Sequence, residues 1–387
     1  MNALIDRVLR RGVESGDVPG VVAAVTDSEG TTYEAAFGKR ALGESADMTV
    51  DTVAWIASMT KALTATAAMQ LVEQGRLELD SPARQWVADL GSVRVLEGFD
   101  EAGKPRTRLA AKPITLRQLL THTSGFGYTM WSENLLRYKD AAGLPGITTC
   151  ENAALNLPLL FEPGEGWEYG IGIDWVGKII EAVSGQKLGI YLHDHVLAPL
   201  EMKDTAFRIS PSMRTRLAKV HQRGEEGTLT AEQFEIPQEP EFEMGGGGLY
   251  STASDYLKFI RMILNRGEAQ DGRVLKAETV DLMSRNQMGD LSVRLLKTAI
   301  PSVTNDAEFF PGMRKTWGLS FMINTEKAPT GRSPGSLAWA GMANTYYWID
   351  PTEGVGGVYI TQVFPFADHK SLPLFLEFEK AVYESML

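Results

Sequence analysis

The segment between residues 53 and 73 reads Val53-Ala-Trp-Ile-Ala-Ser58-Met59-Thr60-Lys61-Ala-Leu-Thr-Ala-Thr-Ala-Ala-Met-Gln-Leu-Val-Glu73. Its first five residues are apolar and strand-like, and the rest is typical of a helix that Gly75 ends. Ser58 and Lys61 stand at positions i and i+3 where the helix begins, so their side chains share one face. A serine hydroxyl needs a neighbouring base to act as a nucleophile, and a lysine can serve when burial or nearby positive charge lowers its pKa. The segment therefore predicts a strand, a nucleophile and a helix, in that order.

The S-x-x-K motif is short, and the chain contains a second match at Ser184-Gly-Gln-Lys187. We interpret this second match as the end of a helix, because Gly185 is a typical C-cap residue. For Ser58 the alternative is a serine at a helix N-terminus beside a solvated lysine. The remaining motifs of the chain decide between these two interpretations.

The two ends of the chain have a different pattern from its middle. Helices are predicted at 2–16 and 372–387, and strands at 18–26, 31–37, 317–325, 345–350 and 355–363. Residues 62–200 are mostly helical in pattern, and residues 223–248, with the run Gly245–Gly248, are predicted to be a long surface connection. We therefore expect a discontinuous sheet domain formed by 1–85 and 245–387, with a mainly helical domain, 86–244, inserted into it.

Length and charge exclude several classes of protein. A chain of 387 residues exceeds the roughly 250–300 residues of a single core, which favours two compact units. The 38 basic and 49 acidic residues give a net charge of −11, which argues against nucleic acid and membrane surfaces as partners. Cys150 is the only cysteine, so an internal disulfide and a cysteine zinc site are excluded. With no signal core and no apolar run of membrane-span length, a cytoplasmic protein is expected, either a monomer or a small homo-oligomer.

Four further motifs follow Ser58 in a fixed order. They are Leu119-Leu-Thr-His-Thr-Ser-Gly125, Phe161-Glu-Pro-Gly-Glu-Gly-Trp-Glu-Tyr169, Gly245-Gly-Gly-Gly-Leu-Tyr-Ser-Thr252 and Trp339-Ala-Gly341. Together, over roughly residues 5–385, they resemble the serine hydrolases with the class C β-lactamase fold, and within that superfamily the family VIII carboxylesterases. The resemblance implies an α+β, β-lactamase/transpeptidase-like fold, in which terminal helices flank an antiparallel sheet. The active site would lie in the cleft between this sheet domain and the helical domain.

The resemblance also implies roles for individual residues. Ser58 would be the nucleophile, Lys61 its partner base, and Tyr169 would share the proton transfers. The backbone N–H groups of Ser58 and Met342 would form the oxyanion hole. Two departures from the β-lactamase pattern argue against efficient β-lactam turnover. Tyr169-Gly-Ile171 lacks the asparagine that contacts the substrate amide, and Trp339-Ala-Gly341 replaces the Lys-Thr-Gly element that binds a carboxylate.

Aromatic residues in the motif segments predict an apolar substrate pocket. The pocket residues expected are Trp339, Gly341, Phe126, Tyr128, Trp131, Trp167 and Ile171. Tyr169 and Trp339 could instead be core aromatics, and His122 is interpreted as part of a structural turn rather than as a base. Gly245–Gly248 lacks the Lys-Ser/Thr of a phosphate-binding loop, and no G-x-S-x-G element is present.

The sequence therefore predicts a serine carboxylesterase that acts through a Ser58 acyl-enzyme. Its substrates are expected to be small molecules, namely short-chain or apolar esters. No metal ion or other cofactor is expected. Three alternatives remain open: β-lactamase or DD-peptidase-like activity, an acyltransferase or amidase that uses the same acyl-enzyme, and a binding module that has kept the fold without the activity.

Overall fold

The computed structural model describes residues 2–270 and 272–386. Its helices are α1 (Asn2–Glu14), α2 (Thr60–Glu73), α3 (Leu116–Leu120), α4 (Glu133–Ala142), α5 (Gly172–Ser184), α6 (Leu188–Leu192), α7 (Pro211–Arg214), α8 (Ala253–Leu264), α9 (Ala277–Met283) and α10 (Ser371–Glu384). Its strands are β1 (Gly20–Thr26), β2 (Thr31–Gly38), β3 (Ala54–Trp55), β4 (Arg94–Phe99), β5 (Pro105–Leu109), β6 (His221–Arg223), β7 (Leu229–Ala231), β8 (Tyr250–Ser251), β9 (Glu268–Ala269), β10 (Gly272–Arg273), β11 (Lys315–Trp317), β12 (Met322–Asn324), β13 (Leu337–Gly341), β14 (Thr345–Asp350), β15 (Val355–Ile360) and β16 (Val363–Phe364).

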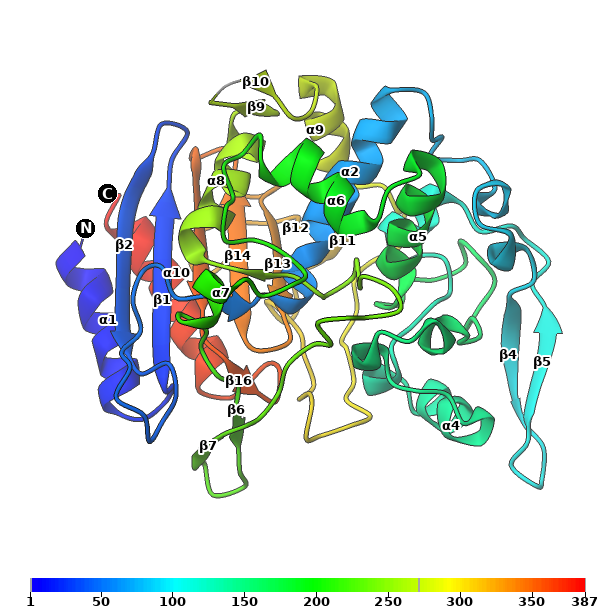
Figure 1. Ribbon diagram of the computed structural model, residues 1–387, viewed down its shortest axis with the longest axis horizontal. Helices are drawn as coiled ribbons and strands as arrows, with labels where there is room; N and C mark the ends of the chain where they lie inside the picture. Colours follow the sequence, from blue (N-terminus) through cyan, green and yellow to red (C-terminus); the bar gives the residue numbers. More distant parts are fainter. Residues whose placement is uncertain (1, 271, 387) are drawn as a thin grey trace.

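A seven-stranded antiparallel sheet in the order β11-β12-β13-β14-β15-β1-β2 is the centre of the fold (Figure 1). Side chains of successive residues point to opposite faces of a strand, and both faces are covered here. On β14, Trp348 packs against Phe378 of α10, whereas Tyr347 packs against Tyr256 of α8. The predicted fold class, an antiparallel sheet flanked by the terminal helices, is therefore confirmed.

Most predicted elements near the chain ends are present, but the strand predicted at 317–325 is wrong. It is two strands, β11 and β12, joined by a tight turn in which the N–H of Gly318 donates to the carbonyl of Phe321 at 2.8 Å. A Cβ atom on Gly318 would lie 2.1 Å from the carbonyl oxygen of Met283, so this glycine is required by a close backbone approach. Gly318 and Ser320 within this segment were the available signal of the turn.

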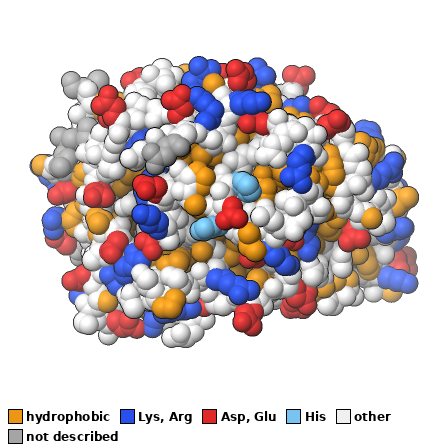
Figure 2. Space-filling model, turned by 45° about the horizontal axis from the view of Figure 1, so that its top comes forward, with side chains coloured by type: hydrophobic (Ala, Val, Ile, Leu, Met, Phe, Trp, Pro, Cys, Tyr) orange, Lys and Arg blue, Asp and Glu red, His pale blue; other side chains and the backbone are white. Residues whose placement is uncertain are grey.

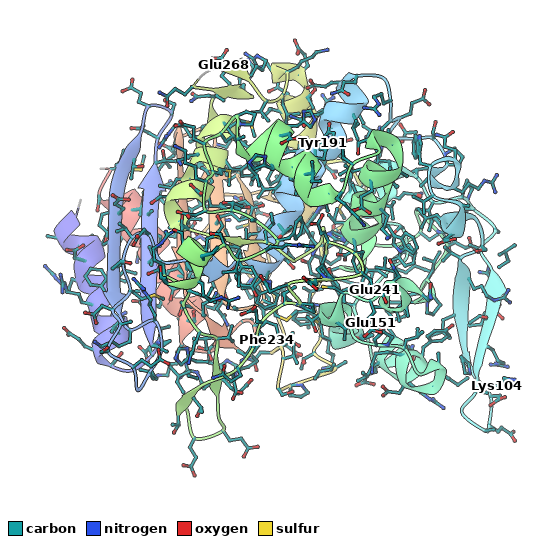
Figure 3. All side chains as sticks on the ribbon, in the orientation of Figure 1. Lys104, Glu151, Tyr191, Phe234, Glu241 and Glu268 are labelled. Carbon is teal, nitrogen blue, oxygen red and sulfur yellow. The ribbon has the colours of Figure 1, made fainter. Side chains whose placement is uncertain are left out.

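The middle of the chain also contains structure that the helical pattern did not predict. β4 and β5 form an antiparallel hairpin, with Lys104 near its tip (Figure 3). The connection predicted over 223–248 is exposed over part of its length only. The run Gly245–Gly248 is buried, not on the surface, because Gly246 lies against Asp174, where a Cβ atom would be 2.5 Å from a carboxylate oxygen.

Helix α2 begins two residues after Ser58, carries Lys61 and runs through the interior of the molecule. Nearly all its residues are buried, and it contacts α5 and α6 on the side away from the sheet (Figure 1). Its buried polar side chains, Thr64 and Gln70 among them, find hydrogen-bond partners there, as buried polar groups require. The sheet takes its strands from both ends of the chain, while the domain boundaries at 85/86 and 244/245 stay a prediction.

The surface carries charges of both signs. On the face shown in Figure 2, acidic and basic side chains are interspersed with apolar ones. None of the helices within the described residues is long and apolar enough to cross a membrane.

Candidate active site

Ser58 lies where strand β3 turns into helix α2. The turn is a short 3₁₀ helix, η1 (Ala57–Met59), and Ala57 adopts a φ of 44°, which is uncommon for a residue with a side chain. Such a turn holds residues i and i+3 in close register, and Lys61 Nζ donates to Ser58 Oγ at 3.1 Å. The structure thus brings the predicted pair together. The alternative of a solvated lysine is wrong, since Lys61 is only 1% exposed.

Lys61 is held by three acceptors and not by Ser58 alone. Its ammonium group also donates to the hydroxyl of Tyr128 at 3.0 Å and to the carbonyl of Gly246 at 2.5 Å. The hydroxyl of Tyr128 donates to Asp174 Oδ2 at 3.4 Å, and the N–H of Gly246 donates to Asp174 Oδ1 at 2.8 Å. A continuous chain of polar groups therefore runs from Ser58 through Lys61 and Tyr128 to a fully buried carboxylate.

Burial changes the protonation of the polar groups that run from Ser58 to Asp174. It lowers the pKa of Lys61 to about 7, against an opposing effect of the Asp174 carboxylate, and it raises the pKa of Asp174. A neutral amine can donate to Tyr128 and Gly246 while its lone pair accepts the Ser58 proton. The protonated amine can donate to all three. The same contacts therefore fit both protonation states of a general base.

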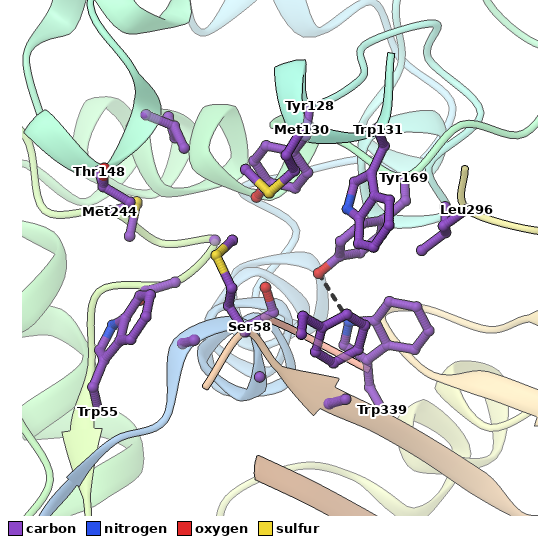
Figure 4. A pocket seen from close by; sticks show the side chains of 18 residues that line it. Trp55, Ser58, Tyr128, Met130, Trp131, Thr148, Tyr169, Met244, Leu296 and Trp339 are labelled. Atoms are coloured by element: carbon purple, nitrogen blue, oxygen red, sulfur yellow. Dashed lines mark hydrogen bonds between the residues drawn. The ribbon is translucent and has the colours of Figure 1, made fainter. Parts of the chain in front are cut away.

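Tyr169 approaches Ser58 from the helical side of the pocket (Figure 4). Its hydroxyl accepts a hydrogen bond from Trp339 Nε1 at 2.8 Å, and its ring centroid lies 4.8 Å from Lys61 Nζ. Burial raises the pKa of Tyr169 above its usual range, and hydrogen bonds with Ser58 and Trp339 only partly offset this. Tyr169 is therefore a neutral phenol near pH 7. Trp339 is both a pocket wall and a hydrogen-bond donor, so it does more than pack.

His122 lies behind Tyr169 and does not line the pocket. Its backbone is in the left-handed region, with a φ of 59°, and its Nδ1 accepts a hydrogen bond from the N–H of Gly170 at 3.4 Å. The rings of His122 and Tyr169 are 4.7 Å apart. Burial, and then the charge of Lys61, hold the pKa of His122 well below its usual value. A neutral imidazole in a turn agrees with the structural interpretation of this segment.

Met342 directly follows strand β13, and both Met342 and Ser58 line the pocket. The strand passes close to the serine segment at Gly341, where a Cβ atom would lie 2.3 Å from the carbonyl oxygen of Ile56 and 2.2 Å from Thr345 Oγ1. Gly341 is therefore needed for the backbone approach and not for a side-chain contact with substrate. The oxyanion-hole role of the two N–H groups stays a prediction.

This close approach makes Gly341→Ala a test of the site geometry. The new methyl group must push β13 away from Ile56, so we expect a destabilisation of about 1–3 kcal/mol and a loss of catalytic activity. Thermal unfolding and turnover of p-nitrophenyl butyrate measure the two effects. Gly30→Ala is the matched control, because a Cβ atom there meets nothing within 4 Å. Equal stability and activity in the two variants would contradict the predicted role of Gly341.

The pocket contains only part of the predicted set. Of the predicted pocket residues, Tyr128, Trp131, Trp339 and Gly341 line it, whereas Phe126, Trp167 and Ile171 do not. Phe126 stacks on Trp175 with ring centroids 6.1 Å apart, Trp167 packs against the rings of His122 and Trp317, and Ile171 is completely buried before α5. These three side chains pack in the core and not at the pocket.

Several pocket residues were not predicted. They are Trp55, Met130, Ile147, Thr148, Met244, Leu296 and Phe366. Trp55 precedes Ser58 by three residues, and that proximity was the available signal. Asp174 was also missed, because an acidic residue in the first turn of a helix is ordinarily a favourable helix charge.

The pocket has about 520 Å³ of empty space, part of it open to solvent. Aromatic and aliphatic side chains dominate its walls (Figure 4), and no lysine or arginine side chain lines it among the described residues. Within the same part of the chain, no group of three or more histidine, cysteine or acidic side chains is placed to hold a metal ion. The arrangement suits a covalent reaction on an uncharged acyl group.

Comparisons with known proteins agree with this geometry. The family model described as Beta-lactamase matches residues 5–377. Monacolin J acid methylbutanoyltransferase of Aspergillus terreus is 32% identical, over 98% of this chain and 95% of that protein. Lovastatin esterase of Penicillium rubens is 30% identical, over 92% of this chain and 91% of that protein. The solved structure of a mutant simvastatin synthase from Aspergillus terreus has a TM-score of 0.86 and 33% identity, and covers 99% of this chain and 96% of that one.

Proposed function

The chain belongs to the beta-lactamase family of serine hydrolases, and from this we propose that it transfers acyl groups from apolar esters to an apolar alcohol or to water. The observation that carries the proposal is the constellation of Ser58 with buried Lys61 and Tyr169, in which Ser58 and Tyr169 line an apolar pocket. A cytoplasmic location and independence of metal ions and cofactors belong to the same proposal.

In the proposed first step, Ser58 Oγ attacks the ester carbonyl while neutral Lys61 accepts the serine proton. The N–H groups of Ser58 and Met342 stabilise the tetrahedral oxyanion, at about 3–4 kcal/mol for each donor in comparable hydrolases. Tyr169 donates its proton to the alkoxy oxygen as the C–O bond breaks, and regains one from Lys61. The alcohol leaves, and the acyl group stays on Ser58.

Lys61 rather than Tyr169 is the proposed immediate base. Burial shifts the pKa values of the two groups in opposite directions, downward for Lys61 and upward for Tyr169. Near pH 7 a neutral amine is therefore populated, whereas a phenolate is not. In the second step an alcohol or water gives its proton to Lys61 and attacks the acyl-enzyme; the bond between the acyl carbon and Ser58 Oγ then breaks, and Lys61 returns the proton to Ser58.

The pocket supports esters over β-lactams. Trp339 stands where the β-lactamase pattern has a cation, and its indole N–H is bonded to Tyr169. A substrate carboxylate would thus meet apolar walls and no charged partner. The narrower resemblance to the family VIII carboxylesterases is part of this proposal.

The choice of acceptor separates the two closest candidate functions. One relative is named a transferase and another an esterase, and the pocket walls favour an apolar alcohol over water because they bury little polar surface. We propose transfer as the main reaction when such an alcohol is present, and hydrolysis in its absence.

Product analysis tests this proposal. The enzyme is incubated with p-nitrophenyl butyrate and increasing cyclohexylmethanol, and the butyrate ester and butyric acid formed are quantified by chromatography. We expect the ratio of ester to acid to rise with alcohol concentration far beyond the ratio set by water and alcohol in solution. Acid alone at every alcohol concentration would establish an esterase instead. Parallel reactions with butylamine and nitrocefin test the amidase and β-lactamase alternatives.

A further inference from the structure

Ser58 lies between two separate groups of mainly apolar side chains. We define the Met244 arm as Trp55, Ile147, Thr148 and Met244, and the Leu296 arm as Trp131, Leu296, Trp339 and Phe366. In Figure 4, Trp55, Thr148 and Met244 lie on one side of Ser58, and Trp131, Leu296 and Trp339 lie on the other. An ester has two portions, acyl and alcohol, that extend in opposite directions from the attacked carbonyl. Two arms around one nucleophile match that division.

The Met244 arm is one packed unit. The indole N–H of Trp55 donates to the carbonyl of Gly247 at 2.7 Å, and the N–H of Gly247 donates to the carbonyl of Met244 at 2.9 Å. The loop that carries Ile147 and Thr148 is tied to the same segment, since the N–H of Phe242 donates to the carbonyl of Cys150 at 3.2 Å. Glu151 and Glu241, which flank this contact, lie close together in Figure 3.

The Leu296 arm is a second unit with different supports. The ring of Phe309 lies 5.9 Å from that of Trp339 and 6.5 Å from that of Phe366, and Phe366 packs edge-on against Trp131 at 6.0 Å. The backbone of Leu296 is paired with that of Ala307 by hydrogen bonds of 3.0 and 2.9 Å. Leu296 is therefore held in place at the wall of the pocket.

Tyr169 belongs to the side of the Leu296 arm, because Trp339 holds its hydroxyl by a hydrogen bond of 2.8 Å. A general acid must lie within hydrogen-bond reach of the oxygen that it protonates. When the ester is cleaved, that oxygen belongs to the alcohol. The alcohol portion of the substrate must therefore extend from Tyr169 along the Leu296 arm.

From this geometry we infer that the Leu296 arm binds the alcohol portion of the ester, and equally the acceptor alcohol, while the Met244 arm binds the acyl chain. The inference rests on the proposed function. The alcohol portion is expected to be bulky and apolar, because the four side chains of the Leu296 arm are two indoles, a phenyl ring and an isobutyl group. None of these four side chains carries a charge. Leu296 sets the size of alcohol that fits.

The chain offers a matched control beside Leu296. Leu295 and Leu296 are the same residue type at adjacent positions, but Leu296 is 4% exposed and lines the pocket, whereas Leu295 is 44% exposed. Arg294 forms an ion pair with Glu168, the residue before Tyr169, so both leucines belong to a segment anchored beside the proposed acid. Truncation of either leucine disturbs the same segment, and only one of them changes the pocket.

Two ester series separate the arms. The acyl series consists of the p-nitrophenyl esters from acetate to octanoate. The alcohol series consists of ethyl, butyl, cyclohexyl and 1-naphthyl butyrate, whose hydrolysis is measured by the release of protons. In Leu296→Ala we expect the ratio of kcat/KM for the bulkiest to the smallest alcohol to rise about tenfold, the effect of one or two methylenes of space, with the acyl series unchanged. Met244→Ala should change the acyl series and leave the alcohol series unchanged. Leu295→Ala should change neither.

A change of the acyl series in Leu296→Ala, or of neither series, would overturn the assignment. If Leu296→Ala fails to fold, Leu296→Met keeps the volume, and its altered shape should still change the alcohol series alone. Wild type and Ser58→Ala are measured on every ester. Equal turnover by wild type and Ser58→Ala would contradict the proposed function itself. That result is distinct from one that contradicts only the assignment of the two arms.

Discussion

Ser58→Ala is expected to lower kcat/KM for p-nitrophenyl butyrate by about 10⁴-fold or more, with an unchanged unfolding temperature. The loss is large because the proposed reaction requires a covalent bond to Ser58 Oγ, and a methyl group cannot form it. The fold should persist, since the Ser58 hydroxyl serves Lys61, which keeps Tyr128 and Gly246 as acceptors. Initial rates on purified wild type and variant measure the effect.

The second S-x-x-K match provides the control for this experiment. Ser184 is the last residue of α5, and Gly185 caps that helix with a φ of 76°, as its sequence predicted. Ser184→Ala should therefore retain wild-type turnover, whereas Ser58→Ala should not. Turnover of Ser58→Ala close to wild type would remove Ser58 from the reaction.

Lys61→Arg is expected to lower kcat/KM by about 10²–10⁴-fold, the usual contribution of a general base. A guanidinium stays protonated in proteins, so it cannot accept the proton of Ser58. It also presents a planar fork to three acceptors that surround a compact amine. Initial rates on p-nitrophenyl esters measure the loss. Lys187→Arg, in the second S-x-x-K match, is the control and should be neutral.

The pH dependence of the wild type tests the same assignment. The pKa of Lys61 is lowered to about 7 by burial, so the ammonium form, which has no lone pair, predominates below that pH. We therefore expect kcat/KM to rise with pH through about 7 and to level off above it. The Tyr169 pKa is raised and adds no further step near neutrality. A flat profile, or wild-type activity in Lys61→Arg, would contradict the role of Lys61.

The sequence predicted best what depends on neighbouring residues. Ser58 and Lys61 are three residues apart, and one helical turn brings them together whatever the rest of the chain does. Asp174 could not be predicted in the same way. Its contacts with Tyr128 and Gly246 join three segments that are distant in the chain, and only the folded backbone shows that they converge.

The sequence also could not predict whether a given side chain points to the pocket or to the core. Phe126 and Tyr128 belong to the same loop, yet Phe126 packs on Trp175 while Tyr128 reaches Lys61. Loops have no fixed side-chain period, so the sequence could not separate them. The prediction that Gly245–Gly248 lie on the surface failed for a related reason. Glycine is typical of surface turns, but it also permits close backbone contacts, and here the contact with Asp174 explains Gly246.

The pairing of β1 with β15, in which Val22 lies opposite Ile360, has a consequence for biosynthesis. A ribosome adds about 5–20 residues per second, so β1, β2 and the serine helix emerge well before their partners β13–β15. During that interval the nascent chain carries Ser58 and Lys61 without β13 and the Met342 that follows it, and it exposes an unpaired edge of β1. Such edges are sites of aggregation, and chaperones that bind nascent chains are expected to protect this one. The polypeptide therefore becomes a working catalyst only after β13–β15 have been synthesised and have joined the sheet.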